Sequence, residues 1–155
     1  MDYDVRIDWE PERTLMVTTF ETSVEEMMAR MPGAAELVKD FLVSRGAPPY
    51  GPSVAYYERG PAGLLVGVGY TVGGRDLPGE GSVMPLSLPG GDVVTTTHLG
   101  GYDSLPDAYL ALKKEAASQG RQVNETGGMW EEHWGGPESP PGQRRIEVFW
   151  PLKKL

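Results

Sequence analysis

The two halves of this 155-residue chain follow the same order of predicted elements, and this internal similarity constrains the fold more than any other feature. In each half a strand precedes a helical section, a glycine ends the helix, and a polar or proline-rich turn leads into further strand. The segment Leu15–Phe20 matches Val93–His98 in character. A duplicated strand–helix–strand–strand unit would produce this pattern, and chance similarity is the alternative explanation.

The spacing between each helix end and the strand after it supports the duplication. Gly46 precedes Tyr57 by the same interval at which Gly120 precedes Glu131. If the repeat holds, Tyr57 is the counterpart of Glu131, and the two side chains would face each other across a pseudo-twofold axis.

Short runs of β-branched, aromatic and apolar residues, separated by clusters of glycine and proline, predict β-strands. Two of the turns between them indicate hairpins, one through Arg59–Gly63 and one around Pro89–Asp92. The predicted strands are Val5–Trp9, Thr14–Thr19, Ser53–Glu58, Leu64–Thr71, Val83–Leu88, Val93–His98, Met129–Trp134 and Arg145–Trp150.

Helices are predicted in two places. Ser23 and Glu26 form a capping-box pattern, which predicts a short helix that stops before Pro32. A second helix is expected over residues 34–44, and the strongest apolar periodicity predicts a helix over residues 105–118. The predicted fold class is therefore α+β: an antiparallel sheet built from two repeated units, with helices on one face and a ligand cleft at the junction.

Length and charge limit the classes of function. A chain of this length fits one domain over residues 1–155. The net charge of −8 argues against direct nucleic-acid binding, because the phosphate backbone requires clustered lysine and arginine. An acidic surface is compatible with a cationic ligand or a basic protein partner, or it serves solubility alone.

The absence of cysteine and the hydropathy of the chain exclude further kinds of site and location. The chain has no cysteine, which excludes disulfides, thiolate nucleophiles and Cys-based zinc sites. It shows neither a signal-peptide pattern at its start nor an apolar run long enough to cross a bilayer, so we expect a cytoplasmic protein that makes no membrane contact.

The predicted strand Met129–Trp134 is the most informative segment for chemistry. Side chains alternate along a strand, so each of its two faces would place one carboxylate among large apolar or aromatic groups. One face carries Met129, Glu131 and His133, and the other carries Trp130, Glu132 and Trp134. A buried carboxylate is costly unless it is paired, which makes this composition unusual for a plain core strand.

Glu131 is the candidate functional carboxylate. In an aromatic-lined pocket a carboxylate can attract a cation while rings stack on the ligand. It can also act as an acid or base after burial raises its proton affinity. The alternative is a purely structural edge strand, on which Glu132 points to water and the remaining side chains pack.

Four tyrosines form a second group of candidates: Tyr56 and Tyr57 on one strand, Tyr70 on its hairpin partner, and Tyr102 after a Gly-Gly pair. Adjacent strand residues point to opposite faces, so at most one of Tyr56 and Tyr57 can line a given cavity. Each tyrosine alone can equally be a packing residue.

Several other chemistries find no support in the pattern. His98 and His133 are the only histidines, and without HxH or HxxxH spacing we expect no metal site and no cofactor. No GxSxG motif marks a serine nucleophile. The glycines at 67, 69, 73 and 74 match neither GxGxxG nor the P-loop, so close backbone packing explains them better than nucleotide binding.

Three segments taken together resemble the GyrI-like family of small-molecule-binding, or effector-binding, domains. They are His98–Tyr102 with the helix through Leu105, Tyr109 and Leu112, the strand and turn Trp130–Pro137, and the closing strand Ile146–Leu152. The family's central glutamate falls on Glu131. The family's tyrosine two positions later is His133 in this chain, which puts the role of that tyrosine in doubt.

The resemblance implies the duplicated antiparallel architecture and a ligand cleft. Members of the family serve as sensor domains of drug-responsive transcription activators, bind lipophilic cations or inhibit DNA gyrase, and some stand-alone members hydrolyse cyclopropane-bearing DNA-alkylating natural products. No helix-turn-helix precedes the domain, so we do not expect the chain to be a transcription factor itself.

Three functions follow from this interpretation. The first is a stand-alone binder that sequesters hydrophobic, aromatic or cationic small molecules, with Glu131 supplying charge and aromatic side chains stacking. The stacking candidates are Tyr57, Trp130, Trp134 and Tyr102, with Tyr56, Tyr70 and Met129 as further lining residues. The second is a hydrolase in which Glu131 activates water while Tyr57 or His133 supplies a proton. The third is binding to DNA gyrase as a protein partner.

Overall fold

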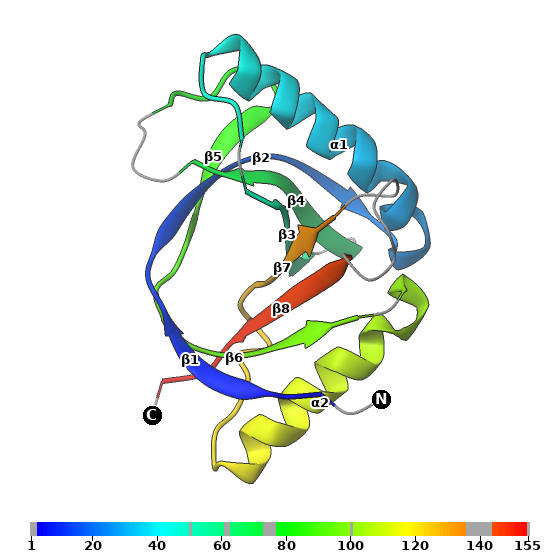
Figure 1. Ribbon diagram of the computed structural model, residues 1–155, viewed down its shortest axis with the longest axis vertical. Coiled ribbons are helices and arrows are strands. Elements are labelled where there is room, and N and C mark those ends of the chain that lie inside the picture. Colours follow the sequence, from blue (N-terminus) through cyan, green and yellow to red (C-terminus); the bar gives the residue numbers. More distant parts are fainter. Residues whose placement is uncertain are drawn as a thin grey trace. The chain divides into compact units, whose positions relative to one another are not determined.

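The computed structural model describes residues 3–49, 51–60, 63–72, 77–99, 101–135 and 144–154, apart from the side chains at positions 24 and 102. The chain divides into two compact units. The middle unit spans Glu12–Pro89, and the terminal unit joins residues 1–11 to Gly90–Leu155. Each unit combines one long α-helix with antiparallel strands, which confirms the predicted α+β class (Figure 1).

The middle unit is a four-stranded antiparallel sheet in the order β3-β4-β2-β5. Its elements are β2 (Arg13–Thr22), α1 (Val24–Ser44), β3 (Ser53–Gly60), β4 (Gly63–Thr71) and β5 (Val83–Leu88). Helix α1 covers one face of this sheet and buries Val38 and Leu42 against Met16, Val72 and Val83.

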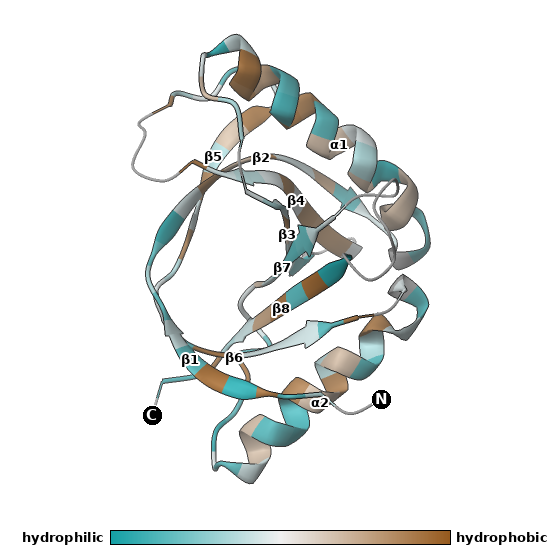
Figure 2. Cartoon of the chain, in the orientation of Figure 1, coloured by the Kyte–Doolittle hydropathy of each residue, from teal (hydrophilic) through white to brown (hydrophobic). Residues whose placement is uncertain are grey.

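The terminal unit has the same plan, with the strand order β1-β6-β8-β7. Its elements are β1 (Arg6–Glu10), β6 (Gly91–His98), the 3₁₀ turn η1 (Tyr102–Ser104), α2 (Leu105–Ser118), β7 (Met129–Trp134) and β8 (Arg145–Pro151). Helix α2 packs its buried stripe onto a cluster that includes Val94, Ile146, Val148 and Trp150. Hydrophobic bands on both helices alternate with hydrophilic ones, as expected of helices covered by a sheet on one side (Figure 2).

Strand pairing places Tyr57 and Glu131 at equivalent positions in the two units. Tyr57 pairs with Val66, in the strand that also pairs with β2. Glu131 pairs with Val148, in the strand that also pairs with β6. Just after the last residue and C-cap of each helix comes a glycine with positive φ, 70° at Gly46 and 73° at Gly120, a conformation that glycine adopts without strain. The strand–helix–strand–strand repeat is therefore present in each unit.

Helix α1 corrects the prediction of two separate helices. It begins as predicted, with the Glu26 amide donating to Ser23 Oγ at 3.3 Å, but it continues through Pro32 to Ser44. Proline removes a helical hydrogen bond and strains the preceding turn. The helix continues because Pro32 is exposed, whereas Met31 and Val38 on either side of it are buried.

The predicted hairpin around Pro89–Asp92 is wrong. Strand β5 pairs with β2 in the middle unit, while β6 pairs with β1 and β8 in the terminal unit. The Pro89-Gly90 step coincides with the boundary between the two units. The local turn signal is correct, but it marks a passage between units and not a turn between paired strands.

Close backbone packing accounts for Gly69, as the sequence indicates. A Cβ atom at this position would collide with the carbonyl oxygen of Met16 on the neighbouring strand. Gly73 and Gly74 lie outside the described residues. Within the described parts of the chain, no helix combines the length and apolar character needed to cross a membrane.

Candidate functional site

Strand β7 presents Glu131 toward helix α2. The residue is 2% exposed and lies opposite Val148, which belongs to the core beneath the helix. Because side chains alternate along a strand, Met129 and His133 share this face with Glu131. The predicted grouping of these three side chains therefore matches the face that carries the terminal unit's core.

Among the described residues, hydrogen-bonding side chains lie at both oxygens of the Glu131 carboxylate. The Tyr109 hydroxyl on α2 donates to Oε2 in a short hydrogen bond. The His133 Nε2 lies 3.0 Å from Oε1. Since a carboxylate only accepts, the hydrogen bond requires the proton of the imidazole to be on Nε2. The buried charge of Glu131 is thus stabilised by hydrogen bonds from two different elements.

Tyr109 is the site residue that sequence reasoning misses, because its spacing marks it only as part of the apolar stripe of its helix. The structure holds its ring against Trp150 in an edge-to-face contact, with centroids 6.0 Å apart and planes at 79°. Trp150 in turn donates from Nε1 to the Asn124 carbonyl at 3.2 Å. One feature of the sequence could have identified Tyr109. It places a tyrosine hydroxyl in the apolar stripe of a helix, and a buried glutamate on a strand needs such a donor.

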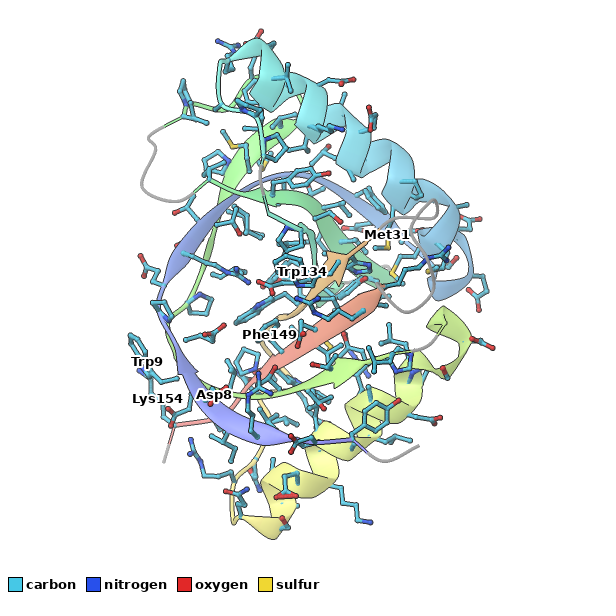
Figure 3. The ribbon with its side chains drawn as sticks, in the orientation of Figure 1. Asp8, Trp9, Met31, Trp134, Phe149 and Lys154 are labelled. Carbon is cyan, nitrogen blue, oxygen red and sulfur yellow. The ribbon has the colours of Figure 1, made fainter. Side chains whose placement is uncertain are left out.

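Trp130 and Trp134 lie on the face of β7 that points away from α2. Trp130 is 1% exposed and stacks on Phe149, the residue labelled on β8 in Figure 3, with ring centroids 5.6 Å apart. The Arg145 guanidinium sits 4.6 Å from the Trp134 ring centroid. The two indoles therefore do not flank Glu131 on its own face, where Tyr109 hydrogen-bonds the carboxylate and packs edge-to-face on Trp150.

Glu132 belongs to this second face and pairs across the strands with Glu147. Glu147 accepts hydrogen bonds from Arg145 at 3.0 Å and Thr97 at 2.8 Å. Two neighbouring glutamates on one strand thus point to opposite faces of the sheet, and only Glu131 points toward the helix.

In the middle unit, the position equivalent to Glu131 has a different character. Tyr57 is 7% exposed, and its hydroxyl contacts the Met31 sulfur of α1 at 3.7 Å. Tyr70 is half-buried against the core beneath the same helix, and burial raises its pKa, with a smaller effect from the negative charge of Glu36.

Tyr56 lies on the other face of β3, as the alternation predicts. Its hydroxyl donates to Glu58 Oε2 at 2.7 Å. Burial raises the pKa of Tyr56, and the hydrogen bond to Glu58 and the charge of that carboxylate raise it further. This tyrosine–glutamate pair is confined to one strand, in contrast to the helix–strand pair of Tyr109 and Glu131.

Of the remaining candidate residues, some pack in the core and one has a side chain that is not described. Met129 is half-buried against the terminal unit's core, and the side chain of Tyr102 lies outside the described part of the chain. His98 is fully buried, with Nδ1 2.9 Å from the Tyr3 hydroxyl and Nε2 2.9 Å from the Gly101 carbonyl. Among the described residues, no group of three or more potential ligands could hold a metal ion.

Comparison with protein families decides the classification. Residues 3–153 match the GyrI-like small molecule binding domain, so the match runs through both units. The chain belongs to the GyrI-like family. No curated protein sequence matches it.

Solved structures share the GyrI-like fold at low sequence identity. The C-terminal domain of EcmrR is 17% identical over 100% of both chains, with a TM-score of 0.75. In an EcmrR–DNA complex the chain spans only 58% of EcmrR, with a TM-score of 0.70 and coverage of 99% of this chain. SAV2435 bound to tetraphenylphosphonium is 12% identical with a TM-score of 0.63, covering 99% of this chain and 94% of that one. A hydrolase from Listeria innocua is 9% identical with a TM-score of 0.65, covering 96% and 91%. At these identities the likeness establishes the fold alone.

Proposed function

We propose that this GyrI-like protein binds hydrophobic aromatic small molecules that carry a positive charge, with Glu131 as the charge partner. The observation that carries the proposal is the buried Glu131 carboxylate between Tyr109 and His133. Protein cores seldom retain such a group, because removing a carboxylate from water costs several kcal/mol before its partners compensate.

The electrostatics favour a cation over a neutral ligand. An ionised Glu131 carboxylate carries a negative charge, and the Tyr109 hydroxyl and His133 Nε2 lie within hydrogen-bond distance of its oxygens. In a low-dielectric interior that charge acts strongly on a ligand cation, since water screens it little. Tyr109 adds aromatic surface next to the carboxylate and packs on Trp150, which suits cation–π contact and ring stacking.

The proposal is tested by comparing a lipophilic cation with a neutral molecule of similar shape. Tetraphenylphosphonium and triphenylphosphine oxide would each be titrated against the intrinsic tryptophan fluorescence, with Trp150 as the fluorophore in contact with Tyr109. We expect the cation to bind at least about tenfold more tightly, as one charge interaction of modest strength provides. Glu131→Gln should reduce this preference to near unity. Equal affinity of the wild-type protein for the two compounds would contradict the proposal.

A hydrolase is the second candidate, and the contact between His133 and Glu131 is the observation that favours it. A carboxylate that takes a proton from water, beside an imidazole at 3.0 Å that can pass a proton on, has the components of general acid–base catalysis. In this reaction the water oxygen bonds to a cyclopropane carbon while a ring bond to that carbon breaks. The electron pair of the broken bond moves to a conjugated carbonyl, whose oxygen gains a proton.

Mass spectrometry distinguishes the two candidates. A cyclopropane-bearing alkylator incubated with a hydrolase gains the mass of one water, and Glu131→Gln abolishes that gain. A compound recovered intact after saturable binding supports the binder and excludes turnover of that compound.

A further inference from the structure

We propose that two copies of this chain associate through the open edges of their β1 strands, in an antiparallel pairing centred on Ile7. The partner is thus a second copy of the same chain. This association is a separate property from the proposed ligand binding, since it involves β1 and not β7. Among the described residues, β1 pairs with one strand, β6, so its other edge has no strand neighbour. An open strand edge is a template for a further strand.

The backbone of β1 directs alternate residues toward β6 and toward the open edge. The amide of Leu152 donates to the carbonyl of Asp92 at 3.0 Å, next to the pairing of β6 with β8. Asp92 therefore directs its backbone groups toward β8, and its neighbour Val93 directs its own toward β1. Because Val93 lies opposite Asp8, the backbone groups of Asp8 point to β6. The N–H and C=O of Ile7, one residue earlier, point to the open edge.

The charges on β1 select one register for a two-fold pairing. Such a pairing must join outward-pointing residues to each other, which allows it to be centred on Arg6, Ile7 or Asp8. Centring on Arg6 sets two guanidinium groups opposite each other, and centring on Asp8 does the same with two carboxylates. Centring on Ile7 sets Arg6 of each copy opposite Asp8 of the other. Opposite charges across two strands stabilise a pair and like charges destabilise it, so the register centred on Ile7 is favoured.

The apolar side chains of β1 fit the same register. Val5 and Ile7 are partly buried against the core beneath α2, whereas Trp9 on the same face is 67% exposed. In the pairing centred on Ile7, the indole of each copy lies opposite Val5 of the other and continues the apolar face across the two-fold axis. The next pair outward would set Glu10 against Asp4, which precedes the first residue of β1. We therefore expect the pairing to end at Trp9.

Arg6 and Asp8 can exchange partners at little cost. They form an ion pair within one strand, with Nε and Oδ2 2.7 Å apart and side chains that are 53% and 47% exposed. Exposed ion pairs contribute little to stability, so replacing a partner on the same strand by one on the opposite strand loses little. The net charge of −8 opposes association at long range, but physiological salt screens charges more than about 8 Å apart. Contacts between the two strands then determine the affinity.

The first test is sedimentation equilibrium of the full chain at physiological salt, from about 10 µM to about 1 mM, the range of weak association. Pairing of two strand edges buries less surface than a standard protein interface. We therefore expect a reversible dimer with a Kd on the order of 100 µM. A chain that stays monomeric throughout this range overturns the inference.

Charge reversals test the register. Arg6→Asp sets carboxylates against carboxylates at both places, and Asp8→Arg sets guanidinium groups against guanidinium groups. We expect each variant alone to dimerise at least about tenfold more weakly than wild type. An equimolar mixture of the two variants should dimerise again, because each copy then supplies the charge that the other lacks. Both side chains are exposed, and circular dichroism checks that each variant is folded.

The double variant Arg6→Asp/Asp8→Arg is the matched control. It exchanges the two charges within one chain, so in the register centred on Ile7 opposite charges still meet, and we expect it to dimerise as wild type does. A dimer that persists unchanged in both single variants places the contact on another surface and overturns the inference. A mixture of the single variants that stays monomeric overturns the register, and with it the proposed pairing.

Discussion

The two units of this molecule place opposite chemistries at the same position of the same scaffold. In the terminal unit Glu131 lies beneath helix α2, and Tyr109 and His133 hydrogen-bond its two oxygens. In the middle unit Tyr57 lies beneath helix α1 and contacts the sulfur of Met31. Since each position belongs to a β-strand next to a helix-covered core, the backbone does not require a charge at either one. The charge of the terminal unit is therefore an added feature of the sequence.

The largest effect is expected when a carboxylate is placed in the middle unit. Tyr57→Glu should lower the free energy of unfolding by about 3 kcal/mol or more, because it removes a buried ring and buries a charge beside a thioether that cannot donate. Urea unfolding at pH 8 measures this loss.

Tyr57→Gln is the control, since glutamine has the size of glutamate without its charge. The new carboxylate of the Tyr57→Glu variant should bind a proton more tightly in the folded state than in the unfolded chain, so the deficit should shrink as the pH falls. Equal stability of the Tyr57→Glu and Tyr57→Gln variants at pH 8 would mean that the middle unit accepts a charge as readily as the terminal unit does.

A smaller effect is expected in the terminal unit when one of the donors to Glu131 is removed. Tyr109→Phe should lower the free energy of unfolding by about 2 kcal/mol, the usual range for a hydrogen bond to a charged group. A double-mutant cycle with Glu131→Gln checks the cause, because the cost of Tyr109→Phe should fall when the carboxylate is absent. Strict additivity of the two substitutions would show that the phenol does not stabilise the charge.

The smallest effect concerns the tyrosine–glutamate pair of the middle unit, which is confined to β3. Glu58→Gln removes the charge of the carboxylate and weakens the hydrogen bond, the two lesser causes of the raised pKa of Tyr56. Burial remains, so the pKa of Tyr56 should fall but stay above its ordinary value. Phenolate absorbance or tyrosine NMR follows the change, and Tyr70 serves as the control because its pKa is raised by burial and Glu36. A shift of Tyr70 equal to that of Tyr56 would indicate a general rearrangement.

The direction of the pH effect on stability can be stated for the wild-type chain. Unfolded tyrosine ionises near pH 10, whereas folded Tyr56 keeps its proton to higher pH. The folded state thus binds more protons than the unfolded state above about pH 10, so the free energy of unfolding falls as the pH rises through that range.

The sequence predicts where the helices and strands lie better than it predicts which strands pair. The helix over residues 105–118 and the strands at 83–88 and 129–134 have the predicted bounds, because periodicity and glycine stops are local properties. The pairing of β5 with β2 depends on contacts distant in sequence, and a turn signal at Pro89 cannot report it. Helix α1 passes through Pro32 because burial on both sides outweighs a local preference.

The candidate site is predictable only in part, because the sequence encodes local patterns but not contacts between distant segments. Alternation along the strand correctly separates Glu131 from Glu132 and groups it with His133. Alternation does not show which face of a strand a helix covers, so the sequence alone could not place Trp130 and Trp134 on the face that points away from α2. Tyr109 reaches Glu131 from another element, and no local pattern encodes that contact.

The most direct test of the central claim is calorimetric titration of tetraphenylphosphonium at pH 8.5 into wild type, Glu131→Gln and Glu132→Gln. The two variants lose the same charge from adjacent positions of one strand, and only the first loses it from the face beneath α2. We expect Glu131→Gln to weaken binding at least about tenfold and Glu132→Gln to change it less than about twofold. Equal losses in the two variants, or unchanged binding by Glu131→Gln, would contradict the assignment of Glu131 as the charge partner.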